Sequence, residues 1–162
     1  MRTSIYLETS IISYLTARPS ADQVTAACQK VTEAWWEKRR KEYALFTSPL
    51  VITEVSAGDP EAAARRLEVL RSIPQLHATD SARQLVEILI ASGALPYKAR
   101  ADALHIAIAT VHRVDYLLTW NCRHIDNPAT KPLIRATCEK EGHMCSEICT
   151  PLEMMEVQQN GK

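Results

Sequence analysis

Four side chains with oxygen atoms are expected at one edge of a sheet: Glu8, Glu54, Asp102 and Asn121. Three of them are carboxylates, which repel one another when packed together unless a cation joins them. Hard cations such as Mg²⁺ and Mn²⁺ prefer oxygen ligands and keep several waters. A metal held in this way activates water and stabilises an in-line displacement at phosphate. The alternative is that each acid is a solvated residue at a helix terminus, and for Asp102 alone the helix dipole is the better explanation.

The elements that would position these residues alternate between short β-favouring runs and longer helical ones. Strands separated by helices predict a parallel sheet covered on both faces, with right-handed crossovers. In such a sheet the working site lies outside the carboxyl ends of the strands, which is where Glu8 and Asn121 follow their strands. Five strands are expected, over residues 4–7, 44–47, 75–78, 115–119 and 147–149.

Helical periodicity and capping residues predict the segments between these strands. In the helix expected over residues 22–42, which Ser20 or Asp22 can cap, the apolar spacing is that of an amphipathic helix. The further helices are expected over residues 11–15, 49–55, 60–73, 81–92, 99–113, 130–141 and 152–157. In the 22–42 helix the expected apolar stripe is Val24, Ala27, Cys28, Val31, Ala34 and Trp35.

Length and composition limit the class of protein. The chain has 162 residues, which is the size of one domain, and we expect a single domain over 1–157 with a polar tail at 158–162. The formal net charge is +0, which excludes a polycation that coats nucleic acid or membrane through bulk charge. Hydrophobic residues make up 46%, too many for a disordered chain.

Neither a membrane span nor a signal peptide is expected, because no apolar run approaches the length that a bilayer requires. The five cysteines are odd in number and lack the rhythm of a disulfide scaffold, so we expect reduced thiols and a cytoplasmic location. A zinc site is an alternative, but its spacing lacks the usual paired ligands on both sides. The residues that suggest zinc are Cys138, His143, Cys145 and Cys149.

Five segments, spread in order over nearly the whole chain, resemble the motifs of PIN-domain proteins. The run ADALHIA at 101–107 is the most specific of them. The others are YLETSIISYL at 6–15, SPLVITEV at 48–55, LLTWNCRH at 117–124 and TPLE at 150–153. The resemblance implies a PIN-like three-layer α/β/α sandwich around a central, mostly parallel five-stranded sheet.

The resemblance also implies an activity, that of a Mg²⁺- or Mn²⁺-dependent endoribonuclease of the VapC toxin type, which acts on RNA. Such a toxin pairs with an antitoxin protein and dimerises. Carried onto this sequence, the site positions are Glu8, Glu54, Asp102 and Asn121, and the first three would bind the metal. Auxiliary positions are Thr9 or Thr119, whose hydroxyl would steady a ligand or a water, and Arg123 and His124, which are well placed to meet a nucleic-acid backbone.

Two departures from the family pattern weaken the expected site. The usual first Asp is Glu8, and the position that is often Asp is Asn121, so one negative charge is missing. We therefore expect one well-bound metal, with any second ion arriving with the substrate phosphate. Asp126 is an alternative source of the missing charge, although its place in a loop favours a surface role. A second hypothesis is a catalytically weakened PIN module that binds RNA or a protein partner.

Other features have simpler explanations. His105, one turn after Asp102, is expected to be a packed or hydrogen-bonded histidine rather than a general base. The basic run at 38–41 suits the negative end of a helix dipole, and contact with phosphate is the alternative. A phosphoacceptor receiver domain would also have clustered acids, but no expected strand ends in an Asp at the site edge.

Overall fold

A computed structural model describes residues 1–156 and shows a four-stranded, parallel sheet in the order β2-β1-β3-β4. The strands are β1 (Ser4–Leu7), β2 (Ala44–Phe46), β3 (Tyr116–Leu118) and β4 (Glu147–Cys149). The central pair is β1 and β3, with Tyr6 opposite Leu117. All four carboxyl ends therefore face one edge of the sheet.

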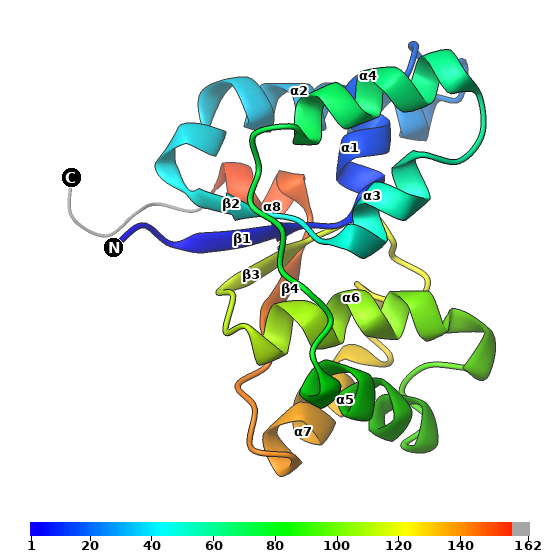
Figure 1. Cartoon of the computed structure of the whole chain (residues 1–162). Helices are drawn as coiled ribbons and strands as arrows, with labels where there is room; N and C mark the ends of the chain where they lie inside the picture. The colour runs from blue at the N-terminus through cyan, green and yellow to red at the C-terminus, as the bar shows by residue number, and fades with distance from the viewer. Residues whose placement is uncertain (157–162) are drawn as a thin grey trace.

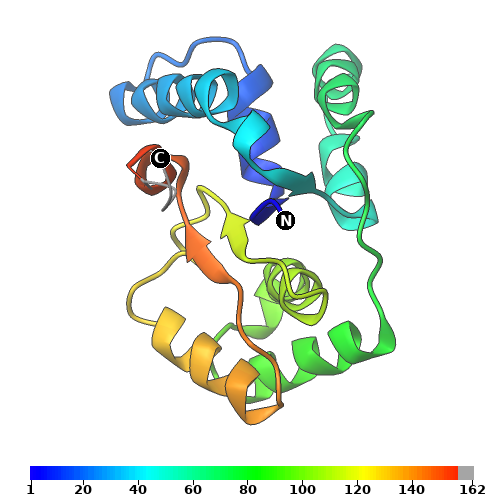
Figure 2. The same cartoon turned by 90° about the vertical axis from the view of Figure 1, so that its left-hand side faces the viewer.

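Helices cover both faces of this sheet (Figures 1 and 2). One layer contains α1 (Thr9–Thr16), α2 (Gln23–Lys38), α3 (Pro49–Val55), α4 (Pro60–Leu70) and α8 (Pro151–Met155). The other contains α5 (Asp80–Ala91), α6 (Arg100–Val111) and α7 (Lys131–Lys140). Short 3₁₀ helices lie at Arg40–Glu42 and Tyr97–Ala99. The expected three-layer α/β/α sandwich is confirmed.

The expected fifth strand over residues 75–78 is wrong. This segment makes one isolated parallel bridge, between Thr47 and Gln75, beyond the end of β2. Two backbone hydrogen bonds hold it there, one from Thr47 to the carbonyl of Pro74 and one from Leu76 to the carbonyl of Thr47. Gln75 and His77 are exposed, so the segment has no second apolar face to bury in a longer strand.

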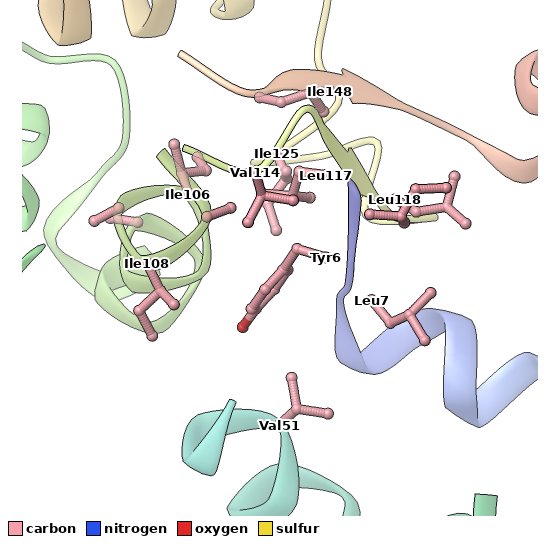
Figure 3. Close-up of a cluster of buried hydrophobic side chains, with 14 of the residues drawn as sticks. Tyr6, Leu7, Val51, Ile106, Ile108, Val114, Leu117, Leu118, Ile125 and Ile148 are labelled. Atoms are coloured by element: carbon pink, nitrogen blue, oxygen red, sulfur yellow. The ribbon is translucent and has the colours of Figure 1, made fainter. Parts of the chain in front are cut away.

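The core lies between the sheet and both helical layers. In Figure 3, Tyr6 of β1 lies between Ile108 of α6 and Val51 of α3, while Leu7 points to the other side of the strand. All of these side chains are at most 1% exposed. The alternation along β1 therefore places the Tyr6 hydroxyl on the side of α3 and α6, close to the carboxyl edge.

The second helix differs from its expected form in length and in its buried face. Asp22 caps it through the backbone N–H of Thr25, as expected, but it ends at Lys38. Its buried residues are Gln29, Thr32 and Trp35, whereas Val24 of the expected stripe is 73% exposed. The stripe is shifted because the polar groups of Gln29 and Thr32 find partners inside the molecule.

The ends of the chain fall partly outside the described region. The expected polar tail at 158–162, and residue 157 at the expected domain boundary, lie outside the described residues. None of the helices within residues 1–156 is both long and apolar enough to cross a bilayer.

Candidate functional site

The carboxyl edge of the sheet gathers the segments that carry the predicted site residues. Glu8 directly follows β1, and Thr119 directly follows β3. A hydrogen bond of 3.1 Å from Thr119 Oγ1 to Glu8 Oε2 joins the two segments. The placement expected from the strand order is thus found at the two central strands.

Glu8 is the N-cap of α1, and its carboxylate is folded back onto its own helix. Oε2 accepts hydrogen bonds from the backbone N–H and the hydroxyl of Ser10, and from Thr119 Oγ1. The residue is only 5% exposed. Three donors converge on this one oxygen, and within residues 1–156 the other oxygen, Oε1, makes no hydrogen bond.

Glu54 lies in α3, which begins where Ser48 caps the helix and Pro49 takes its first position. Its Oε1 accepts hydrogen bonds from Thr9 Oγ1 and from His105 Nε2, both at 2.6 Å. Burial raises the pKa of Glu54, but the hydrogen bonds from His105 and Thr9 outweigh burial and hold that pKa below its ordinary value. Glu54 is therefore an ionised, half-buried acid whose Oε2 has no hydrogen-bond partner within the described residues.

Behind Glu54 lies a buried chain of polar groups. The Tyr6 hydroxyl lies 2.8 Å from His105 Nδ1 and 2.7 Å from Ser48 Oγ. Burial raises the pKa of Tyr6 well above its ordinary value, so this hydroxyl keeps its proton. His105 is 1% exposed and bonded through both ring nitrogens, in agreement with the expected hydrogen-bonded histidine.

Asp102 stands in the first turn of α6, one turn before His105. The helix has no side-chain cap, so a carboxylate in this turn interacts favourably with its free N–H groups. Asp102 is half-buried, and its carboxylate makes no hydrogen bond or ion pair within residues 1–156. His105, one turn further along α6, binds Glu54, so this part of α6 lies beside α3.

Asn121 is engaged in its own loop. Its Oδ1 accepts from the backbone N–H of His124, and its carbonyl accepts from Ile125 and Asp126. The loop is anchored by Trp120, whose backbone N–H donates to Ser10 Oγ. Asn121 therefore lies beside Thr119 at the edge but is not hydrogen-bonded to any of the three acids.

The residues after Asn121 divide into exposed and buried groups. Arg123 is exposed and His124 is half-buried, so Arg123 is open to solvent. The surface role expected for Asp126 is wrong, because this residue is 8% exposed and its Oδ1 lies 2.5 Å from Lys131 Nζ. The charge of Asp126 is thus neutralised by Lys131.

The donors at this edge suit a hard cation without forming a closed cage. Within residues 1–156, no three His, Cys, Asp or Glu side chains are grouped as a metal site. Mg²⁺, however, is usually bound by one or two carboxylates together with waters and substrate phosphate. Glu54 and Asp102 supply oxygen atoms without hydrogen-bond partners in this region, and Glu8 adds a third carboxylate.

The sequence did not indicate the hydrogen-bond partners of the acids and of His105. Tyr6, Ser10 and Ser48 all lie inside the quoted motifs, yet nothing in their types indicates that they bind His105 or Glu8. Two cations of the basic run at 38–41 have structural partners: Arg39 pairs with Glu42, and Arg40 stacks on Trp36. These contacts agree with the simpler explanation of that run.

Two hollows differ in their relation to the acids. One of about 610 Å³ opens at the opposite edge of the sheet, around Ser4 and Asp115, and contains none of the predicted site residues. Another, of about 320 Å³, lies between α3, α5 and α6 and is lined by Leu50, Leu104 and the neighbour of Asp102, Ala101. The chemistry of the acids, not the size of a hollow, therefore locates the candidate site.

Comparison with known proteins identifies the fold. No protein-family model and no curated protein sequence matches the chain. The crystal structure of VapC20 from Mycobacterium tuberculosis, a toxin that cleaves the sarcin–ricin loop, is similar with a TM-score of 0.59 and 17% identity, over 76% of this chain and 95% of that one. VapBC2 from Rickettsia felis, bound to a DNA fragment from its promoter, is similar with a TM-score of 0.58 and 15% identity, over 91% and 98%. The chain has a PIN-like fold of the VapC type, as its motifs led us to expect.

Proposed function

From this fold and the acids that follow or flank its strands near the carboxyl edge, we propose that the chain is a metal-dependent endoribonuclease, the toxin of a toxin–antitoxin pair. The observation that supports it best is that hydrogen bonds join the segments carrying the acids near the carboxyl edge of the sheet. Thr119 binds Glu8, Thr9 and His105 bind Glu54, and Asp102 lies one turn before His105. The similar VapC20 structure is that of a toxin that cleaves the sarcin–ricin loop, and it supports the toxin assignment that the sequence motifs suggested.

Glu54 and Asp102 would hold Mg²⁺ or Mn²⁺, with Glu8 as a third ligand through the oxygen that its three hydrogen bonds leave open. When bound, the ion would neutralise phosphate charge and lower the pKa of a water. The protein's own residues prepare this site: His105 and Thr9 keep Glu54 ionised and oriented, and Thr119 holds Glu8. With only three carboxylates, we propose one well-bound ion. Asn121 would orient a ligand or water from the adjoining loop.

The RNA itself would meet the exposed Arg123 and the neighbouring His124. Because the net charge is +0, these cations alone give little affinity, and binding would depend on the metal. An antitoxin is the proposed protein partner, supported by the VapBC2 structure. We also propose a homodimer and a cytoplasmic place of action.

The test is cleavage of single-stranded RNA with Mg²⁺ or Mn²⁺, with EDTA, and in the variants Glu54→Gln and Asp102→Asn. We expect both variants to lose at least about a hundredfold in rate, which is the scale of removing one electrostatic catalytic group. Glu54→Gln keeps an oxygen that accepts from Thr9 and His105, so its fold should be retained. Cleavage that persists in both variants, or in EDTA, would contradict the proposal.

A second candidate function is a weakened PIN module that binds RNA or protein. The cap formed by Glu8 and the loop contacts of Asn121 favour it, because both occupy oxygens that a stronger site would offer to metal. Calorimetry with Mg²⁺ and Mn²⁺ separates the two candidates. No binding at millimolar metal, together with RNA binding that needs no metal, would support the module.

A further inference from the structure

His105 connects the candidate site to a buried chain of hydroxyl groups. The chain runs from Ser48 Oγ to the Tyr6 hydroxyl over 2.7 Å, and from that hydroxyl to His105 Nδ1 over 2.8 Å. From His105 Nε2 it reaches Glu54 Oε1 over 2.6 Å. Ser48 and Tyr6 are 0% exposed, so each of their polar hydrogens needs a partner within the protein.

Hydrogen-bond counting gives this chain a direction. Ser48 Oγ also accepts from the backbone N–H of Val51, as the cap of α3. If the Ser48 hydroxyl donates to the Tyr6 oxygen, the Tyr6 hydroxyl is free to donate to His105 Nδ1. Nδ1 then carries no proton, and the ring proton lies on Nε2, which faces Glu54 Oε1. In the reverse direction the Ser48 proton has no acceptor within residues 1–156. Because an unpaired buried donor is costly, the first direction holds.

We propose that Ser48, Tyr6 and His105 are positioning residues, which keep the His105 ring oriented with its Nε2–H towards Glu54 and thereby hold Glu54 ready to bind metal. This role rests on the proposed function, in which Glu54 is a metal ligand. None of the three would touch RNA or the ion; they act through the Glu54 carboxylate.

The benefit lies in the ordering of a flexible acid. Glu54 is 32% exposed at its side chain, and a Glu side chain loses considerable rotamer freedom when it is fixed. His105 and Thr9 both bind its Oε1, so the carboxylate is held from two sides while Oε2 keeps no partner in the described region. An ion would then meet a ligand that is already ordered, which is how preorganisation improves affinity.

The experiment compares Tyr6→Phe with Tyr43→Phe in the full-length chain. Tyr43 is also buried, at 3% exposure, and stacks on Trp35 away from the chain of hydroxyls, so its variant controls for loss of a core hydroxyl. Nitrogen NMR of the metal-free protein reports which ring nitrogen of His105 carries the proton. Calorimetry with Mn²⁺ alone reports affinity.

In the wild type and in Tyr43→Phe we expect protonated Nε2 and unprotonated Nδ1. In Tyr6→Phe the ionised Glu54 still keeps the proton on Nε2, but Nδ1 has lost its donor. We therefore expect a shifted Nδ1 signal and a Mn²⁺ affinity about 10–100-fold weaker, the usual effect of removing a group that orients a metal ligand. As a second pair, His105→Gln can still donate to Glu54 and should bind Mn²⁺ more tightly than His105→Leu.

A Mn²⁺ affinity of Tyr6→Phe within twofold of that of Tyr43→Phe would overturn the positioning role. The same holds if His105→Gln binds Mn²⁺ no better than His105→Leu. Failure of the proposed function looks different, because the wild type itself would then bind no Mn²⁺ and cleave no RNA.

Discussion

Replacing Thr32 by Val tests how the loop that carries Asn121 is held. Thr32 is 0% exposed, and its Oγ1 accepts a 2.8 Å hydrogen bond from Trp120 Nε1. Trp120 is half-buried, stacks on Tyr14 and immediately precedes Asn121. Valine has nearly the same shape but accepts no hydrogen bond, so the substitution leaves the indole N–H unpaired with little change in packing.

The expected cost follows from this geometry. Leaving a buried donor unpaired costs about 1–3 kcal/mol, and we take the lower part, about 1–2 kcal/mol, because Trp120 is only half-buried. The second bond of Thr32, from Oγ1 to the carbonyl of Cys28, is a local helical contact of little net value. For a chain of this length the melting temperature should fall by about 2–8 °C.

The assay is thermal unfolding followed by circular dichroism, with Thr16→Val as the matched control. Thr16 donates to the carbonyl of Ile12 in the same kind of local bond, and its hydroxyl accepts nothing within residues 1–156. If Thr32→Val and Thr16→Val unfold within about 0.5 kcal/mol of each other, the scale of ordinary surface substitutions, Trp120 does not anchor this loop through Thr32.

Two further predictions concern the ionised groups around the site. Asp126→Asn breaks the pair with Lys131 and should lower the free energy of unfolding by about 1–3 kcal/mol. This is less than for a fully buried pair because the Lys131 side chain is 22% exposed. RNA cleavage per folded molecule should stay unchanged, and a loss of cleavage would show that Asp126 replaces the missing site charge. Burial raises the pKa of Glu54, but the hydrogen bonds from His105 and Thr9 lower it further, so the folded protein has the lower Glu54 pKa. The ionised Glu54 therefore stabilises the fold at pH values above the unfolded-state pKa of about 4.3, and this stabilisation is lost as the pH falls through the folded-state pKa. Urea unfolding of the wild type and Glu54→Gln across acidic pH should show their difference narrowing towards low pH, and a constant difference would contradict the assignment.

Local signals in the sequence were sufficient to predict most of the fold. Ser48 followed by Pro49 marks the start of α3, and Asp22 marks that of α2, because each side chain caps a free backbone N–H. The segment at Gln75 has the local pattern of a strand but not its surroundings. A strand needs a neighbouring strand to pair with along its length, but here pairing is limited to one bridge, between Thr47 and Gln75. Tertiary structure, not the local pattern, decides how far such pairing extends.

The edge near which the segments carrying the acids lie was predictable for a topological reason, since strands that run parallel end on the same side. Their hydrogen-bond partners were not. Tyr6 and His105 are separated by 99 residues, and only the folded chain shows that one hydroxyl lies against one ring nitrogen. The burial of Asp126 was missed for a local reason, because the turn before α7 folds the loop back so that Lys131, at the start of that helix, reaches Asp126.

Glu8, which is longer than the Asp usual at this position of the family pattern, has a structural role as well as a proposed metal-binding role. Side chains that cap helices are usually shorter than Glu, yet Glu8 reaches the backbone N–H of Ser10 at 2.8 Å and binds Thr119 with the same oxygen. One carboxylate oxygen therefore stabilises α1 and its link to the segment after β3, while the other is the one proposed to bind metal. A change at Glu8 would disturb both at once, so a loss of cleavage could not be assigned to metal binding. Glu54 and Asp102 cap no helix with their side chains, and for that reason their amide variants give the cleaner test of the proposed site.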